Sequence, residues 1–287
     1  MRGETAGDQS PLLVIRSLLR RLKKLAKIRG LFWICVSPIC LLFSITSAYL
    51  GLISAKKDCV RILDVTDKTI LVLASNSPRR RQLLALGNWK YSAIVSDVDE
   101  SQLAGEAPRD YVLRLAQAKA LAVAEKVQPE NIIIGSDTAV IFGNSIFGKP
   151  KDEAEAEWML KQLRGQTHQV YTGVAFYRVS DGKMLTELCI TDVPMRAYSA
   201  DEITAYIQTG DPMDKAGAYA IQHPKFQPVE SMNGCFAGVM GLPMCHVLRA
   251  LHTFDIHPEA DVPMACQNLL NYKCHVSGAI LRGETSD

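Results

Sequence analysis

Hydrophobic and polar positions change their spacing several times along the chain. The apolar run 69–75 is typical of a buried strand, and the spacing over 77–87 predicts a helix. A second strand is predicted over 91–97. Residues 108–127 have the pattern of an amphipathic helix that begins at Pro108. Strands that alternate with helices in this way favour an α/β fold.

Longer strands are predicted in the middle of the chain. Residues 131–143 indicate a buried strand that is broken at the Gly-Ser-Asp sequence 135–137. The alternating segments 168–179 and 183–197 predict an antiparallel hairpin around the turn 180–182. Three more helices are predicted, over 152–165, 199–210 and 242–254. Crossover helices together with a long hairpin favour an α/β fold on a mixed sheet.

The N-terminal part of the chain differs from the rest. A basic stretch precedes residues 31–55, which carry no charge and are long enough to span a bilayer. Three interpretations stay open: a retained membrane anchor, a cleaved signal peptide, and a segment that is not made because translation starts near Val60. The chain is therefore divided into an extension (1–68), a folded domain (69–255) and a tail (256–287) without a predicted element.

Composition narrows the class of protein. The 287 residues are 48% hydrophobic and carry a formal net charge of only +2, so a basic surface for nucleic acid is not expected. The eight cysteines form no C-x-x-C pair, which favours reduced thiols over disulfides or zinc. The six histidines include no H-x-x-x-H pair, so a histidine-ligated metal has little support.

An arginine-rich turn follows the first predicted strand. Residues 73–87 read LASNSPRRRQLLALG, so Ser75–Arg80 lies between a strand and a helix. Backbone N–H groups and the positive end of a helix meet at such a turn and suit an anion, and arginines add bidentate phosphate contacts. The alternative is a helix cap followed by a solvated basic face. Taken alone, the turn does not decide between the two.

Other charged residues lie near the ends or interiors of apolar segments. Each of them alone is more often structural than functional. Together they form two groups: cations suited to anions (Arg79, Arg80, Lys119, Lys149 and Lys215) and carboxylates suited to a divalent cation (Glu100, Asp137 and Asp214). Such a set can stabilise phosphoryl oxygens, hold Mg²⁺ and orient an attacking water. Since no G-x-x-x-x-G-K-[ST] loop is present, the set indicates phosphate ester hydrolysis outside the P-loop class.

Several motifs over residues 69–254 resemble those of the Maf nucleotide pyrophosphatases. In family order they are LASNSPRRRQLL, VDES, YVLRLAQAKA, IIGSDTAV, FGKP, LRGQTHQVYTGV, DPMDKAGAYAIQ and GVMGLPM. The resemblance implies an enzyme that needs Mg²⁺ or Mn²⁺ and cleaves nucleoside triphosphates between the α and β phosphates. It also implies an elongated mixed sheet with helices, similar to that of the inosine triphosphatases, with an active cleft between two lobes, and a possible homodimer.

The same resemblance implies roles for individual residues. The motifs SPRR, SDT and DKAGAYAIQ are similar to the branch that accepts dTTP, UTP and modified pyrimidine nucleotides. The implied roles are a proton acceptor (Asp137), specificity positions (Arg79, Thr138 and Gln222), metal ligands (Glu100 and Asp137) and phosphate contacts (Ser75, Arg80, Lys119, Lys149 and Lys215). His223 and Pro224 depart from the family pattern, in which a glycine follows the Ile-Gln pair.

Two further expectations depend on the resemblance. The family is also associated with arrest of septum formation, so a nucleotide-binding regulator of cell division is the alternative function. Because nucleoside triphosphates and Mg²⁺ are cytosolic, a cytoplasmic enzyme is expected, and a membrane partner is expected only if segment 31–55 is made and retained.

Overall fold

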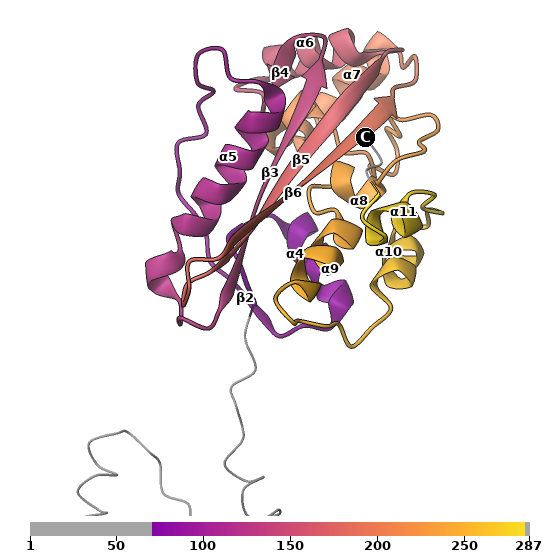
Figure 1. Ribbon diagram of the computed structural model, residues 1–287. Helices are drawn as coiled ribbons and strands as arrows, with labels where there is room; N and C mark the ends of the chain where they lie inside the picture. Colours follow the sequence, from indigo (N-terminus) through magenta and orange to yellow (C-terminus); the bar gives the residue numbers. More distant parts are fainter. Residues whose placement is uncertain (1–70, 285–287) are drawn as a thin grey trace, which may run out of the picture. The chain divides into compact units, whose positions relative to one another are not determined.

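The computed structural model describes residues 71–284, which belong to the compact unit Asp67–Asp287 (Figure 1). The predicted extension 1–68 and its apolar segment 31–55 lie outside the described residues. Within the described part of the chain, no helix is both long enough and apolar enough to cross a membrane.

A mixed sheet forms the centre of the fold (Figure 1). Its strand order is β2-β1-β3-β5-β6, and β4 pairs with β3. β1 is parallel to β2 and β3, whereas β3, β5 and β6 are antiparallel to one another. The strands are β1 (Leu71–Leu73), β2 (Tyr91–Ala93), β3 (Ile132–Phe142), β4 (Ser145–Phe147), β5 (Thr167–Arg178) and β6 (Met184–Pro194). The α/β fold on a mixed sheet is therefore confirmed.

The predicted break in the third strand is wrong. β3 pairs with β5 without interruption from Ile132 to Ile141, and Ser136 and Asp137 are part of this ladder. The Ser136 hydroxyl is within hydrogen-bond distance of the carbonyl oxygens of Gly173 (3.1 Å) and Gly241 (2.9 Å), so this polar residue is satisfied inside the sheet.

Helices cover both faces of the sheet and both ends of its long strands. They are α4 (Pro78–Leu84), α5 (Pro108–Leu121), α6 (Glu153–Leu163), α7 (Ala200–Ile207), α8 (Phe236–Val239), α9 (Met244–His252), α10 (Val262–Leu270) and α11 (Ser277–Leu281). Short 3₁₀ turns are η1 (Ala85–Gly87), η2 (Ala124–Lys126), η3 (Asp211–Asp214) and η4 (Ala216–Ala218). The predicted helix 108–127 thus ends at Leu121, and the predicted strand 91–97 ends at Ala93.

The tail beyond residue 255, for which no element was predicted, contains α10 and α11. Val262 of α10 is fully buried in the same hydrophobic cluster as α4, β1 and α9. Asp261 caps α10 through a hydrogen bond from the Met264 backbone N–H.

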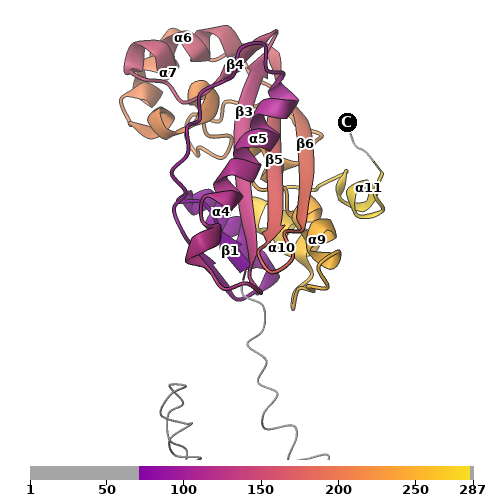
Figure 2. The same cartoon turned by 60° about the vertical axis from the view of Figure 1, so that its left-hand side comes forward.

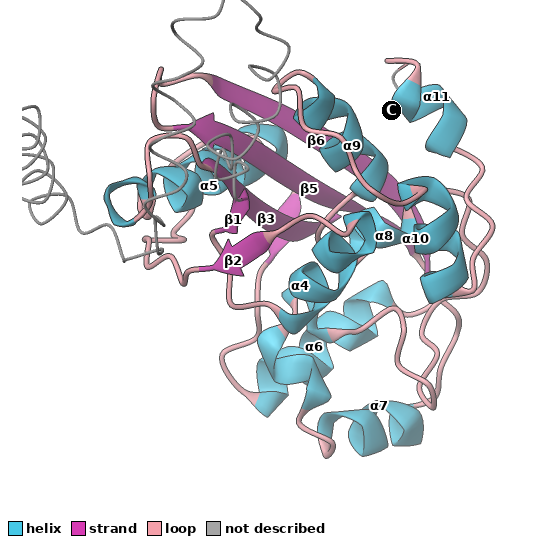
Figure 3. Cartoon of the chain, turned by 90° about the horizontal axis from the view of Figure 1, so that it is seen from below, coloured by secondary structure: helices cyan, strands magenta, loops and turns pink. Residues whose placement is uncertain are grey.

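Two large hydrophobic clusters are formed with helices that lie at opposite ends of the long strands, α9 and α10 at one end and α6 and α7 at the other (Figure 2). One contains residues of α4, β1, α9 and α10, and the other contains residues of α6 and α7. Successive side chains of β1 point to opposite faces of the sheet, and both faces are buried. Leu71 and Leu73 belong to the first cluster, whereas Val72 belongs to a smaller third cluster that includes Ala116 and Ala120 of α5. Seen from below, α5 and α9 cover opposite faces of the sheet (Figure 3).

Two glycines let α5 lie unusually close to the sheet. A Cβ atom on Gly135 of β3 would lie 2.1 Å from the Ala116 carbonyl oxygen, and one on Gly173 of β5 would lie 2.6 Å from the Val112 carbonyl oxygen. Side chains at these two positions would therefore collide with the helix backbone. The close approach therefore sets the distance between α5 and β3.

Two buried histidines make stability depend on pH. Burial lowers the pKa of His168 and of His246 to about 4, and the Nδ1 atom of each has no hydrogen-bond partner among the described residues. Between pH 6.5 and 4 the unfolded chain therefore binds more protons than the folded chain. Acidification should lower the free energy of unfolding, by about 3 kcal/mol per histidine at pH 4.

Urea denaturation of the wild type and of His168→Gln at a series of pH values measures this effect. The variant should lose part of the dependence on pH, whereas His252→Gln, at an exposed position, should keep it. If the free energy of unfolding changed equally with pH in all three proteins, His168 would not be a source of the pH dependence.

Candidate functional site

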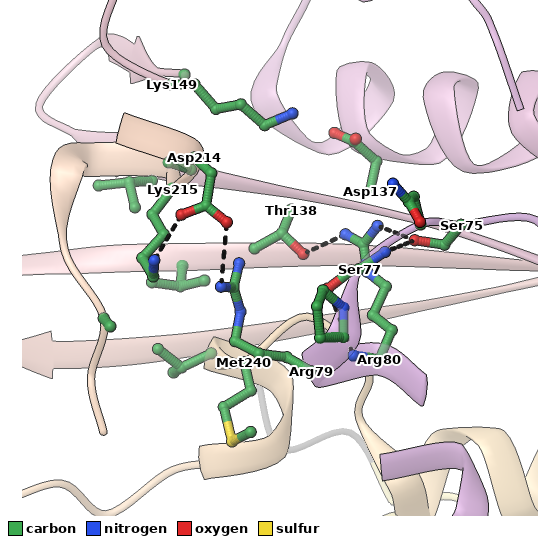
Figure 4. Close-up of a pocket in the computed structure, with 18 of the residues that line it drawn as sticks. Ser75, Ser77, Arg79, Arg80, Asp137, Thr138, Lys149, Asp214, Lys215 and Met240 are labelled. Carbon is green, nitrogen blue, oxygen red and sulfur yellow. Dashed lines mark hydrogen bonds and ion pairs between the residues drawn. The ribbon is translucent and has the colours of Figure 1, made fainter. Parts of the chain in front are cut away.

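One pocket of about 520 Å³ opens between the two hydrophobic clusters. All the residues that the sequence singled out for site roles line it: Ser75, Arg79, Arg80, Glu100, Lys119, Asp137, Thr138, Lys149, Lys215 and Gln222. Figure 4 shows most of them, with side chains that converge from β3, from the turn before α4 and from the η3–η4 region. Residues separated by more than a hundred positions thus line one pocket, and their individual roles stay predictions.

Arg80 is held in the pocket by three hydrogen bonds. Its guanidinium donates to the Gly241 carbonyl (2.9 Å), to Ser75 Oγ (3.3 Å) and to Thr138 Oγ1 (3.2 Å). Ser77 caps α4 by accepting the Arg80 backbone N–H, so the strand-to-helix turn and its arginine are fixed together. Burial lowers the pKa of Arg80, and Asp137 acts in the opposite direction. A partly buried guanidinium of this kind offers fixed N–H donors and a delocalised positive charge to an anion.

Lys119 of α5 holds two carboxylates together. Its Nζ lies 2.6 Å from Glu100 Oε1 and 2.6 Å from Asp137 Oδ1. Burial raises the pKa of Asp137, although Lys119 and Arg80 act to lower it. Burial also acts to raise the pKa of Glu100, but the hydrogen bond and the charge of Lys119 outweigh it and the net change is downward. The pKa values of the two acids are therefore shifted in opposite directions, and the raised pKa makes Asp137 the better proton acceptor.

The carboxylates of Glu100 and Asp137 offer oxygen ligands to a divalent cation. Glu100 and Asp137 supply hard oxygen ligands that lie close enough to share one ammonium group. No cluster of three or more His, Cys, Asp or Glu residues that could hold a metal occurs among residues 71–284. Mg²⁺ is commonly bound by one or two carboxylates and by the substrate's phosphates, so this donor set fits it.

Two cations of the pocket form ion pairs with acidic residues of η3. Arg79 Nη1 lies 3.7 Å from Asp214 Oδ2, which joins α4 to η3 (Figure 4). Lys215 is held by three oxygens: the Asp211 carbonyl (2.5 Å), Asp211 Oδ1 (3.0 Å) and Asp214 Oδ1 (2.5 Å). Since an ammonium has three donors, Lys215 is fully engaged by η3, and its phosphate contact stays a prediction.

Lys149 and Gln222 are two of the predicted residues that face solvent. Both are exposed, and Lys149 extends across the pocket toward Asp137 (Figure 4). Lys149 forms no ion pair with any residue of the described part of the chain. Gln222 follows Tyr219–Ile221 along the chain, and all four residues line the pocket. Their side chains are thus placed to meet a ligand.

The departure at His223 and Pro224 is accommodated in a turn beside the pocket. His223 Nδ1 accepts a hydrogen bond from the Phe226 backbone N–H (2.9 Å). Arg196 donates to the carbonyls of Phe226 (2.6 Å) and Gln227 (2.9 Å), which holds the turn from outside.

Sequence reasoning missed two tyrosines of the pocket wall, Tyr111 and Tyr219. Tyr219 is buried, and its hydroxyl pairs with His168 Nε2 at 2.8 Å. The Tyr111 hydroxyl donates to the Glu100 carbonyl at 2.9 Å. A signal for Tyr111 was present, because it lies eight residues before Lys119 and therefore on the same side of the helix.

The fold and the site define an α/β protein whose pocket suits a ligand rich in phosphate together with a cation. The chain belongs to the Maf-like protein family, whose model matches residues 70–254. It is 45% identical over 184 residues to the dTTP/UTP pyrophosphatase of Geotalea uraniireducens, an alignment that covers 64% of this chain and 94% of the relative. The dTTP/UTP pyrophosphatase of Bacillus cytotoxicus is likewise 45% identical over 184 residues, and that alignment covers 64% of this chain and 95% of the relative.

Among solved structures, the Ham1 protein of Staphylococcus aureus aligns with 56% of this chain and 91% of its own length. The identity is 17% and the TM-score is 0.35, a likeness too distant to support an argument.

Proposed function

We propose that this protein hydrolyses nucleoside triphosphates to the monophosphate and pyrophosphate, with dTTP, UTP and modified pyrimidine nucleotides as substrates. The observation that carries the proposal is that two carboxylates held by Lys119 line the same pocket as Arg80, which is partly buried. The names of the similar enzymes support the substrate class.

In this mechanism Asp137 accepts a proton from the water that attacks the α phosphorus. Its raised pKa suits a general base, and Lys119 keeps the carboxylate in place. Arg79, Arg80 and Lys149 would neutralise the triphosphate, so that pyrophosphate leaves with its charge compensated.

Glu100 and Asp137 would also hold a Mg²⁺ or Mn²⁺ ion. When bound, the ion supplies Lewis-acid stabilisation of charge on the phosphoryl oxygens. Because nucleoside triphosphates are cytosolic, we place the activity in the cytoplasm. We also propose a homodimer, which light scattering on the purified protein would test.

The reaction is tested by release of pyrophosphate from dTTP, UTP, CTP, GTP, 7-methyl-GTP and modified pyrimidine triphosphates, with Mg²⁺, with Mn²⁺ and with a chelator. Preferential release from dTTP and UTP, abolished by the chelator, is the expected result. Binding of nucleotide without release from any of them would contradict the proposal and favour a nucleotide-binding regulator.

Gln222 is expected to contribute to the choice of base. Its amide offers both a donor and an acceptor, as the edge of a pyrimidine requires. Gln222→Ala should lower the ratio of kcat/KM for UTP to that for GTP about tenfold, the value of roughly one hydrogen bond. Gln227→Ala, in the neighbouring turn, serves as the control. A ratio that is unchanged in Gln222→Ala would remove this residue from the specificity site.

A further inference from the structure

The loop that carries Glu100 has no regular structure of its own. It runs from the end of β2 at Ala93 to Pro108, beside α5 (Figure 2). The Glu100 side chain is 46% exposed, yet it reaches Lys119 at 2.6 Å. Since an irregular segment does not hold a carboxylate in place by itself, other contacts must fix this loop.

A face of α5 supplies those contacts. Arg114 donates from Nε and Nη2 to the two oxygens of Glu106 (2.6 and 2.8 Å) and from Nη2 to the Ser101 carbonyl (3.0 Å). Tyr111, one turn earlier, donates to the Glu100 carbonyl. Two successive carbonyls of the loop are thus held by one helix.

Glu106 closes the loop from its other end. Only 7% of the Glu106 side chain is exposed, and its carboxylate also accepts the Leu103 backbone N–H at 3.1 Å. A bidentate pair between arginine and a carboxylate fixes orientation as well as distance. The pair therefore sets the shape of the segment between Glu100 and Pro108.

The same helix presents Lys119 to the acidic pair. At about 100° per residue, Arg114 lies about 60° to one side of Tyr111 and Lys119 about 80° to the other, so Tyr111 lies between the residue that holds the loop and the one that holds Asp137. A shift of the loop relative to α5 would therefore move Glu100 away from Lys119 and Asp137.

We propose that Arg114 and Glu106 are positioning residues for the reaction: their ion pair places Glu100 beside Asp137. This inference rests on the proposed function and extends it to residues that do not line the pocket. The pair acts through the loop and touches neither the phosphates nor the base.

The test compares Arg114→Lys, Glu106→Gln and the double variant with the wild type, all as the full chain. Arg114→Lys keeps the charge but loses the bidentate geometry. Asp181→Asn is the matched control, because it breaks a bidentate pair with Arg178 in the exposed β5–β6 turn. The measurements are kcat and KM for UTP, and amide hydrogen exchange of residues 96–106.

Each single variant should lower kcat about 10- to 100-fold, as loss of a supporting contact does in metal sites. KM should change less than about threefold, because the phosphate contacts remain. Exchange in 96–106 should become faster. The double variant should be no worse than the poorer single one, since the two residues act as one pair.

Two results would overturn the inference: faster loop exchange with unchanged kcat, or lower kcat with unchanged loop exchange. A fall in kcat of similar size in Asp181→Asn would also overturn it, because the effect would then be general. Failure of the proposed function is recognised separately, since the wild type itself would release no pyrophosphate.

Discussion

Asp137→Asn should reduce turnover about 10²- to 10⁴-fold while the protein stays folded, because the substitution removes the proton acceptor but keeps the shape of the side chain. Burial raises the pKa of Asp137, which means that the ionised carboxylate is held at a cost in the folded state. A neutral amide avoids that cost. Lys119 loses one carboxylate partner but keeps Glu100, so stability at pH 7 should stay close to that of the wild type.

Pyrophosphate release and urea denaturation, measured on the same preparations, separate the two effects. Asp192→Asn, an exposed carboxylate on β6, is the matched control and should change neither. A near-normal rate in Asp137→Asn would show that the base has been assigned to the wrong residue. A large loss of stability would show that the carboxylate is mainly structural.

Gly135→Ala is expected to have the largest effect on stability. The added Cβ would lie 2.1 Å from the Ala116 carbonyl oxygen and 2.8 Å from the Ala120 backbone nitrogen, so α5 must move away from β3. The free energy of unfolding should fall by about 3 kcal/mol, as for an overpacked core. Because α5 carries Lys119, activity should fall further than the loss of folded protein explains.

Gly148→Ala is a suitable control for stability. A Cβ atom on Gly148 meets nothing within 4 Å, so the same chemical change should leave the urea midpoint almost unaltered. A midpoint for Gly135→Ala equal to that of the wild type would mean that α5 does not lie as close to the sheet as described.

The pattern of the chain predicted most of the elements around the site. The β-branched run at β3, the capped α6 and α7, and the β5–β6 hairpin all have strong local signals, and local and tertiary preferences agree there. The interruption predicted at residues 135–137 shows where such reasoning fails. Glycine and two polar residues look like a turn, but here the glycine admits α5, Ser136 bonds to Gly241, and Asp137 bonds to Lys119.

The residues of the pocket were predictable as a set, but their partners were not. Nothing in the local sequence indicates that Lys215 is saturated by Asp211 and Asp214, or that Arg80 contacts the Gly241 carbonyl. Such contacts depend on how distant segments meet, and composition or periodicity does not contain that information. The helices of the tail escaped prediction because α10 and α11 each have a single buried position and therefore no apolar face with helical spacing.

β3, β5 and β6 each extend through both hydrophobic clusters, and their ladders are continuous. A hinge motion between the two ends of the sheet would have to break these paired backbone hydrogen bonds, so the sheet should move as one rigid body. Closure over a substrate is then left to short peripheral segments: the turn before α4, the loop that carries Glu100, and η3 with η4. Free and nucleotide-bound forms should superimpose over the whole sheet and differ only in these segments.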